Sequence, residues 1–177
     1  MGLDYGNLDE RTRALMLAEI DRDISAGTLF LSDNLNPQGR TDYPDLLKTA
    51  ARVGSDVTLA AEIHHRLNSH EKPRKLRSGA FSKPPVMRSN AHEMLAEGEF
   101  NRFYIRAVCL RALEDGVAGV IVYRAKVVEN PRAESEQKIG QHVSPEPLLA
   151  DLRTHPGVDT ALGLPPGPNS GLSVKLP

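Results

Sequence analysis

The chain has 177 residues, a length typical of one compact domain with a real hydrophobic core. Its 22 Lys and Arg nearly balance its 23 Asp and Glu, and a formal net charge of −1 excludes a strong overall field that would attract nucleic acid or an anionic membrane. The single cysteine, Cys109, excludes an internal disulfide and a multi-cysteine metal site, and it fits a reducing compartment.

Hydropathy argues against a membrane partner. No stretch reaches the about 18 consecutive apolar residues of a membrane-spanning helix. The N-terminal residues include Asp4, Asp9 and Glu10 instead of a basic segment followed by an apolar one. The sequence therefore predicts a soluble, cytoplasmic protein.

Residues 8–27 predict an amphipathic helix. Asn7 is expected to cap its start near Leu8, and Gly27 supplies the stop. Residues 28–31 are expected to form a short strand or an extended passage, and residues 33–39 have the composition of a turn.

Two further helices are expected before residue 68. The first begins at Thr41 or Asp42, has Pro44 in its first turn and ends at Gly54. Ser55 is expected to cap the next helix, which runs to about residue 67. Residues 1–67 are therefore predicted to form a module of three antiparallel helices.

Residues 68–90 have a different composition. This segment contains Pro73, Pro84, Pro85 and several serines, and it has few apolar residues. Such a composition is typical of a loop or linker that extends over the surface, so the main domain boundary is expected here.

Residues 91–177 are predicted to form an α+β module. Ser89 or Asn90 is expected to cap a helix that Gly98 bends or splits and that stops at Gly116. Residues 117–128 are rich in β-branched side chains and predict a strand, which is central in its sheet because its first half is apolar on both faces.

The central strand needs partners, for which residues 28–31 and the alternating residues 172–176 are the candidates. Short helices are expected over residues 133–139 and 144–153, followed by a loop rich in Pro and Gly over residues 155–171. The predicted fold class is α+β with helix predominant: an N-terminal three-helix module, a basic linker, and a C-terminal helix packed on a small sheet.

The main electrostatic signal is a cluster of cations between residues 64 and 88, which contains one acid, Glu71. Because phosphate contacts dominate nucleic-acid affinity, such an arm suits salt-sensitive binding of nucleic acid or of an acidic protein surface. Phe81 is its only aromatic residue, which argues against a stacking platform for single strands. A solvated linker is the alternative. The candidate contact residues are Arg66, Lys72, Arg74, Lys75, Arg77, Lys83 and Arg88.

A second set of cations lies on the predicted central helix and strand. Arg102 and Arg106 share a helix face, so their guanidinium groups could hold a phosphate. Internal salt bridges are the alternative, since Glu99 has the helical spacing to pair with Arg102. The candidate residues for an anionic ligand are Glu99, Arg102, Arg106, Tyr123 and Arg124, with Glu99 available as an acid or base.

The sequence lacks the patterns of common metal and nucleotide sites. His64, His65 and His70 have neither the spacing of a zinc helix nor that of histidine-and-asparagine metal nucleases, although a site from His64, His70 and a nearby glutamate is an alternative. Arg124 stands where a nuclease strand would need a carboxylate ligand. No glycine-rich phosphate loop occurs. We therefore expect no metal site and no cofactor.

Three functions follow as hypotheses. The favoured one is a non-catalytic binding or assembly protein, in which the helical module docks a protein partner and the basic arm contacts nucleic acid or an acidic protein surface. The second is a small enzyme of unknown class that binds an anionic ligand near the central helix and strand. The third is a structural homo-oligomer subunit, which self-associates through the proline-rich segment or the terminal strand.

Overall fold

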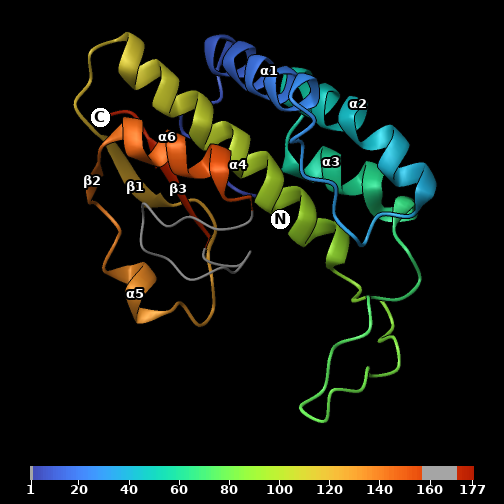
Figure 1. Ribbon diagram of the computed structural model, residues 1–177. Helices are drawn as coiled ribbons and strands as arrows, with labels where there is room; N and C mark the ends of the chain where they lie inside the picture. Colours follow the sequence, from blue (N-terminus) through green and yellow to red (C-terminus); the bar gives the residue numbers. More distant parts are fainter. Residues whose placement is uncertain (1, 157–170) are drawn as a thin grey trace.

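The computed structural model describes residues 2–156 and 171–177 and confirms a helix-predominant α+β fold (Figure 1). Its described elements are α1 (Glu10–Ser25), α2 (Pro37–Val53), α3 (Asp56–Ile63), the 3₁₀ turn η1 (His64–Arg66), α4 (Ala91–Glu114), β1 (Val120–Arg124), α5 (Ala133–Glu136), β2 (His142–Val143), α6 (Pro145–Thr154) and β3 (Leu172–Lys175). None of the helices in these two ranges combines the length and the apolar character needed to cross a bilayer.

Side-chain caps set where the first two helices begin. α1 begins at Glu10 and not near Leu8, because the Asp9 carboxylate accepts a hydrogen bond from the Thr12 N–H at 2.9 Å. α2 begins at Pro37, earlier than predicted, because the Asn36 side chain accepts from the Gly39 N–H at 2.7 Å. The predicted turn over residues 33–39 is therefore shorter than expected, and Pro44 lies inside the helix.

The predicted cap of α3 is confirmed. The Ser55 hydroxyl accepts from the Val57 N–H at 3.2 Å, and the Thr58 hydroxyl accepts from the Ser55 N–H at 2.8 Å, so the two residues form a capping box. The helix ends at Ile63, and the turn η1 continues it to Arg66.

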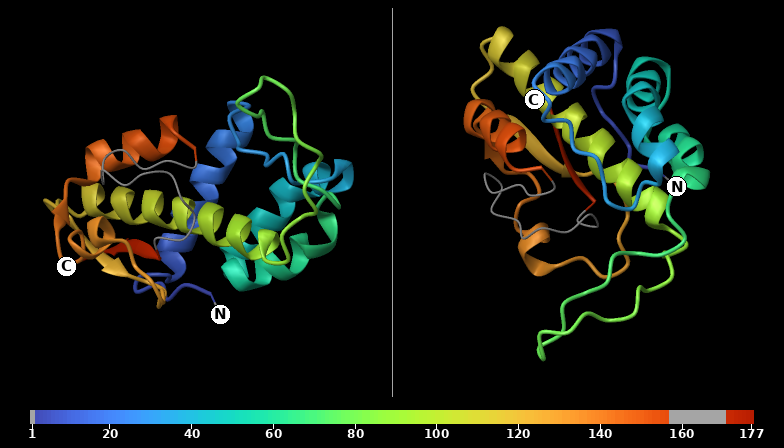
Figure 2. Two further views of the ribbon diagram at one scale, coloured as in Figure 1. Left: turned by 90° about the horizontal axis from the view of Figure 1, so that it is seen from below. Right: turned by 45° about the vertical axis from the view of Figure 1, so that its right-hand side comes forward.

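The central element is α4, which runs for 24 residues without a break. Gly98 neither splits nor ends it, and a Cβ at Gly98 would meet no atom within 4 Å. In Figures 1 and 2, α1, α2 and α3 lie on one side of α4, and α6 and the sheet lie on the other. Phe100, Phe103 and Tyr104 are fully buried between these layers.

One cluster of buried apolar residues joins the two predicted modules. It contains Met16, Leu47 and Leu59 from the N-terminal helices together with Phe100 of α4 and Val122 of β1. Within the described residues, the N-terminal helices have no core apart from the one that they share with α4. That residues 1–67 form a module of their own stays a prediction.

The sheet has the order β2-β1-β3 and is antiparallel, so β1 is central as predicted. The predicted terminal strand is confirmed as β3, with Val122 opposite Val174. Residues 28–31 form no strand, because the N–H groups of Thr28 and Leu29 donate to the Asp23 carbonyl at the end of α1. The predicted loop over residues 155–171 lies mostly outside the described residues.

Candidate nucleic-acid interface

Residues 69–87, which we call the hairpin arm, fold back on themselves and project from the helical body between η1 and α4. Figure 1 shows the arm in green, extending away from the helices. His70 lies opposite Val86 and Lys75 lies opposite Phe81, so the two limbs of the arm are antiparallel. The segment predicted as an irregular linker therefore contains a β-hairpin.

A three-residue turn forms the tip of the arm. The Leu76 N–H donates to the Ala80 carbonyl at 2.7 Å, and the Gly79 N–H donates to the Leu76 carbonyl at 3.0 Å. Gly79 has a φ of +85°, a left-handed conformation that glycine adopts without strain. A type I turn followed by a left-handed glycine is a common three-residue hairpin connection.

The root of the arm is fixed to the loop that precedes α2. The Asn68 N–H donates to the Asn34 carbonyl at 2.8 Å, and the Asn68 side chain donates to the Asp33 carbonyl at 3.0 Å. A Cβ at Gly39 in the first turn of α2 would collide with the Arg66 carbonyl oxygen, so α2 and η1 pack backbone against backbone beside this junction. The Arg66 side chain pairs with Asp42 at 2.9 Å and therefore stabilises this junction.

Acidic side chains neutralise the cations nearest the root. Glu71 pairs with Arg88 at 2.6 Å and with Arg74 at 3.4 Å. The hydrogen bond from Arg88 is the main cause that lowers the pKa of the Glu71 carboxyl. Lys72 pairs with Asp33 at 2.7 Å. The cations of these pairs are exposed to solvent, so the pairs contribute little to stability, but they reduce the positive charge of the root half of the arm.

The tip half of the arm keeps its positive charge. Lys75, Arg77 and Lys83 are exposed, and no described acidic side chain pairs with them. The sequence has no acid between Glu71 and Glu93. Three cations therefore stand together on a narrow ribbon that projects from a molecule of nearly neutral net charge.

Three histidines meet beside the root of the arm. The His64 ring centroid lies 4.6 Å from that of His65 and 4.4 Å from that of His92. His70 lies on the arm and contacts the Ser69 hydroxyl. Over residues 2–156 and 171–177, no group of three or more His, Cys, Asp or Glu side chains is arranged to hold a metal ion.

Arg106, a candidate for the anionic ligand, is buried in an internal ion-pair cluster. Its guanidinium donates to Asp23 at 2.6 and 2.9 Å and to Glu19 at 2.7 Å. Arg153 also pairs with Glu19, at 2.6 Å. Burial opposes ionisation of Glu19, but the hydrogen bonds and charges of Arg153 and Arg106 outweigh it and lower the Glu19 pKa.

The other four candidates for the anionic ligand lie in three different surroundings. Arg102 pairs with Glu99 at 3.0 Å as its helical spacing predicts, and burial raises the pKa of the Glu99 carboxyl. The Tyr123 hydroxyl donates to the Asp4 carbonyl at 2.5 Å. Arg124 pairs with Glu136 of α5. The five candidates therefore do not converge on one pocket in the described structure.

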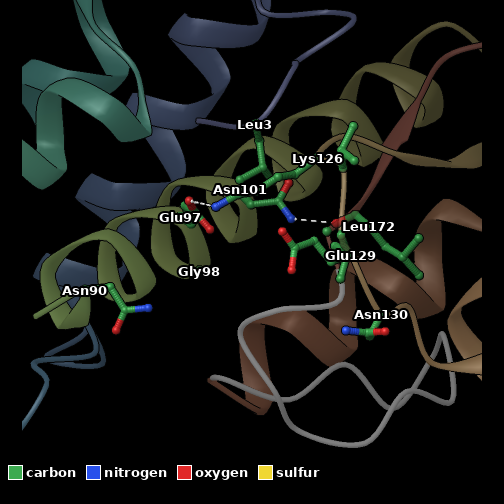
Figure 3. Close-up of a pocket in the computed structure, with 12 residues that line it drawn as sticks. Leu3, Asn90, Glu97, Gly98, Asn101, Lys126, Glu129, Asn130 and Leu172 are labelled. Carbon is green, nitrogen blue, oxygen red and sulfur yellow. Dashed lines mark hydrogen bonds and ion pairs between the residues drawn. The ribbon is translucent and has the colours of Figure 1, made fainter. Parts of the chain in front are cut away.

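A half-open cavity of about 640 Å³ lies between α4 and residues 126–130 (Figure 3). Three of its polar side chains bond within the protein: Lys126 pairs with Glu97, and the Asn101 amide donates to the Leu172 carbonyl at 2.9 Å. None of the ligand-binding candidates from the sequence lines this cavity. Its walls come from segments remote in the chain, so no local sequence signal could have found it.

Comparisons with models of known protein families, with curated proteins and with solved structures find no match to this chain. Charge and geometry are therefore the features that bear on its function.

Proposed function

We propose that the protein is a non-catalytic binding protein that contacts nucleic acid through the tip of its hairpin arm. The observation that carries this proposal is the exposed set of Lys75, Arg77 and Lys83 on a projecting two-stranded ribbon without a neighbouring acid. Such a ribbon is narrow enough to follow a groove of a nucleic acid, where cations meet a line of phosphates.

The expected binding is salt-sensitive and weakly specific, because each neutralised phosphate releases counterions without reading a base. Cations nearer the root, such as Lys72 and Arg88, are paired with acids and are expected to contribute less. Docking of a protein partner on the helical module stays a prediction, as does self-association through the proline-rich segment or the terminal strand. A cytoplasmic location also stays a prediction, which the single cysteine of the sequence supports, since one cysteine cannot form an internal disulfide.

The test measures binding of fluorescent duplex DNA, single-stranded DNA and duplex RNA by anisotropy over a range of salt concentrations. The variant Lys75→Ala/Arg77→Ala/Lys83→Ala should reduce the slope of log affinity against log salt by roughly 0.7–0.9 for each phosphate that the arm no longer neutralises. A matched triple variant, Arg52→Ala/Arg132→Ala/Lys138→Ala, removes the same charge away from the arm and should leave the slope unchanged.

Three results would overturn the proposal. The first is no retention of any nucleic acid by the wild-type protein at the lowest salt. The second is an equal decrease of affinity in the two triple variants, which would show a response to net charge alone. The third is polyglutamate binding to the arm as tight as that of nucleic acid, which would favour an acidic protein surface.

A further inference from the structure

The hairpin arm exposes apolar side chains among its cations. Leu76, Phe81 and Val86 are 49%, 69% and 73% exposed. Phe81 lies opposite Lys75, and Leu76 begins the turn at the tip, so apolar and cationic groups share the same end of the ribbon. Phosphate contacts explain the cations but not a phenyl ring held in solvent beside them.

We infer that the arm enters the minor groove of duplex DNA and that Phe81, supported by Leu76, inserts as a wedge at a base step and bends the duplex. This inference rests on the proposed function and adds the class of nucleic acid and the role of the apolar residues. The cations would contact phosphates on both sides of the groove. The Phe81 ring would leave water and pack against bases. Proteins that insert apolar side chains in this way offset the cost of unstacking the bases with the contacts that the bend permits.

The composition of the arm favours the minor groove of DNA. Residues 72–87 of the arm contain no Asn, Gln, Asp or Glu, so the arm lacks the side chains that recognise adenine or cytosine in the major groove. Its Arg and Lys side chains can contact bases or phosphates in either groove, but an exposed apolar side chain beside them is typical of minor-groove proteins that insert a wedge. The deep, narrow major groove of duplex RNA does not admit side chains for readout. A single-strand site needs several stacking aromatic rings, and the arm has one.

The test uses a duplex of about three helical turns with a dye at each end, so that bending raises energy transfer between the dyes. A central TA step is compared with a stiff A-tract, since pyrimidine–purine steps unstack more easily. The wild-type protein should bend the TA duplex by roughly 20–90° and bind it more tightly than the A-tract duplex.

Phe81→Ala should abolish the bend and weaken duplex binding roughly 5- to 150-fold, the range seen when one base-stacking aromatic ring is removed. Its salt slope should stay at the wild-type value, because its cations are intact. Phe81→Trp should keep the bend. Val53→Ala, which truncates an apolar side chain that is 75% exposed at the end of α2, is the matched control and should change neither the bend nor the affinity.

Phe81 lies outside the buried cluster, so thermal melting of Phe81→Ala should match that of the wild type.

The outcomes separate this inference from the proposed function. If the wild-type protein binds DNA with the expected salt slope but leaves it straight, or if Phe81→Ala binds and bends like the wild type, the wedge is wrong and the charge-based function stands. Tighter binding to single strands or duplex RNA than to duplex DNA would also overturn the wedge alone. If no nucleic acid binds, both fall.

Discussion

Arg106 has one of the largest fully buried side chains in the described structure. It lies between Glu19 and Asp23 of α1, and its guanidinium carbon is 4.7 Å from the centroid of the Phe103 ring. A buried ion pair adds little net stability, but removal of one partner leaves an uncompensated charge away from water. Arg106 is therefore expected to hold α1 against α4.

Arg106→Met should lower the free energy of unfolding by about 3–5 kcal/mol, because Asp23 would lose its buried counter-ion and Glu19 would keep only the more exposed Arg153. Urea denaturation monitored by circular dichroism measures this change. Arg153→Met is the control, since Arg153 pairs with the same glutamate from a more exposed position and should cost about 1 kcal/mol. Restored stability in Glu19→Leu/Asp23→Leu/Arg106→Met would confirm the mechanism, and a neutral Arg106→Met would contradict it.

Pairing within a helix could be predicted from the sequence, but pairing between helices could not. Glu99 and Arg102 are three residues apart, and their ion pair follows from helical spacing. The acids that bind Arg106 are 83 and 87 residues away and come together with it only when α1 packs on α4. Sequence spacing alone therefore made Arg106 a candidate for ligand binding.

At the scale of elements, the geometry of the hairpin arm depends on Gly79. An L-amino acid in the left-handed conformation of this glycine costs about 1–2 kcal/mol. Gly79→Ala should therefore weaken the pairing of the tip and raise amide hydrogen exchange at Leu76 roughly 5- to 30-fold. The melting temperature of the whole protein should stay constant, because the tip contributes no residue to the buried core.

The same substitution in α4 is the control for Gly79→Ala. Gly98 lies inside this helix, and its added methyl group would enter open space. Gly98→Ala should stabilise the protein by about 0.5–1 kcal/mol, because alanine restricts the unfolded chain and favours the helix. Faster exchange at the tip in Gly98→Ala, or a lower melting temperature in Gly79→Ala, would contradict this account.

The hairpin could not be recognised in the sequence because its prolines resemble those of a linker. Pro73, Pro84 and Pro85 cannot donate backbone hydrogen bonds, so strand pairing is incomplete where they stand. The one signal for it is Ser78-Gly79, a turn dipeptide that has an apolar residue two positions before it, Leu76, and another two positions after it, Phe81. By contrast, β1 and β3 have β-branched or alternating patterns, and both were predicted.

At the scale of the whole molecule, the arm is separable from the core. Ser69 and Met87 face each other and share a hydrogen bond of 2.9 Å, so Asn-Gly in place of residues 70–86 should close the chain as a short turn. This variant should unfold in one calorimetric transition with a melting temperature within a few degrees of the wild type, and it should no longer bind nucleic acid. Two transitions would show that the helices before and after the arm fold as separate units.

The fold class was predictable because it depends on local patterns of hydropathy and capping. The shared core was not predictable from the sequence, because it depends on contacts of α1 and α3 with α4 over long sequence separations. Composition predicts a domain boundary at the arm, and this boundary stays a prediction; the elements on both sides of the arm pack on α4.

The proline-containing middle of the arm has a kinetic consequence. Between the Glu71–Pro85 and Arg74–Ser82 hydrogen bonds, no backbone hydrogen bond joins the two limbs in the described structure. We therefore expect the tip to move as a small paired unit about this neck, while hydrogen bonds hold the root to the loop before α2. A mobile cationic tip can contact a polyanion from more positions than a rigid one. The neck should therefore raise the association rate with a long polyanion without changing the structure of the helical body.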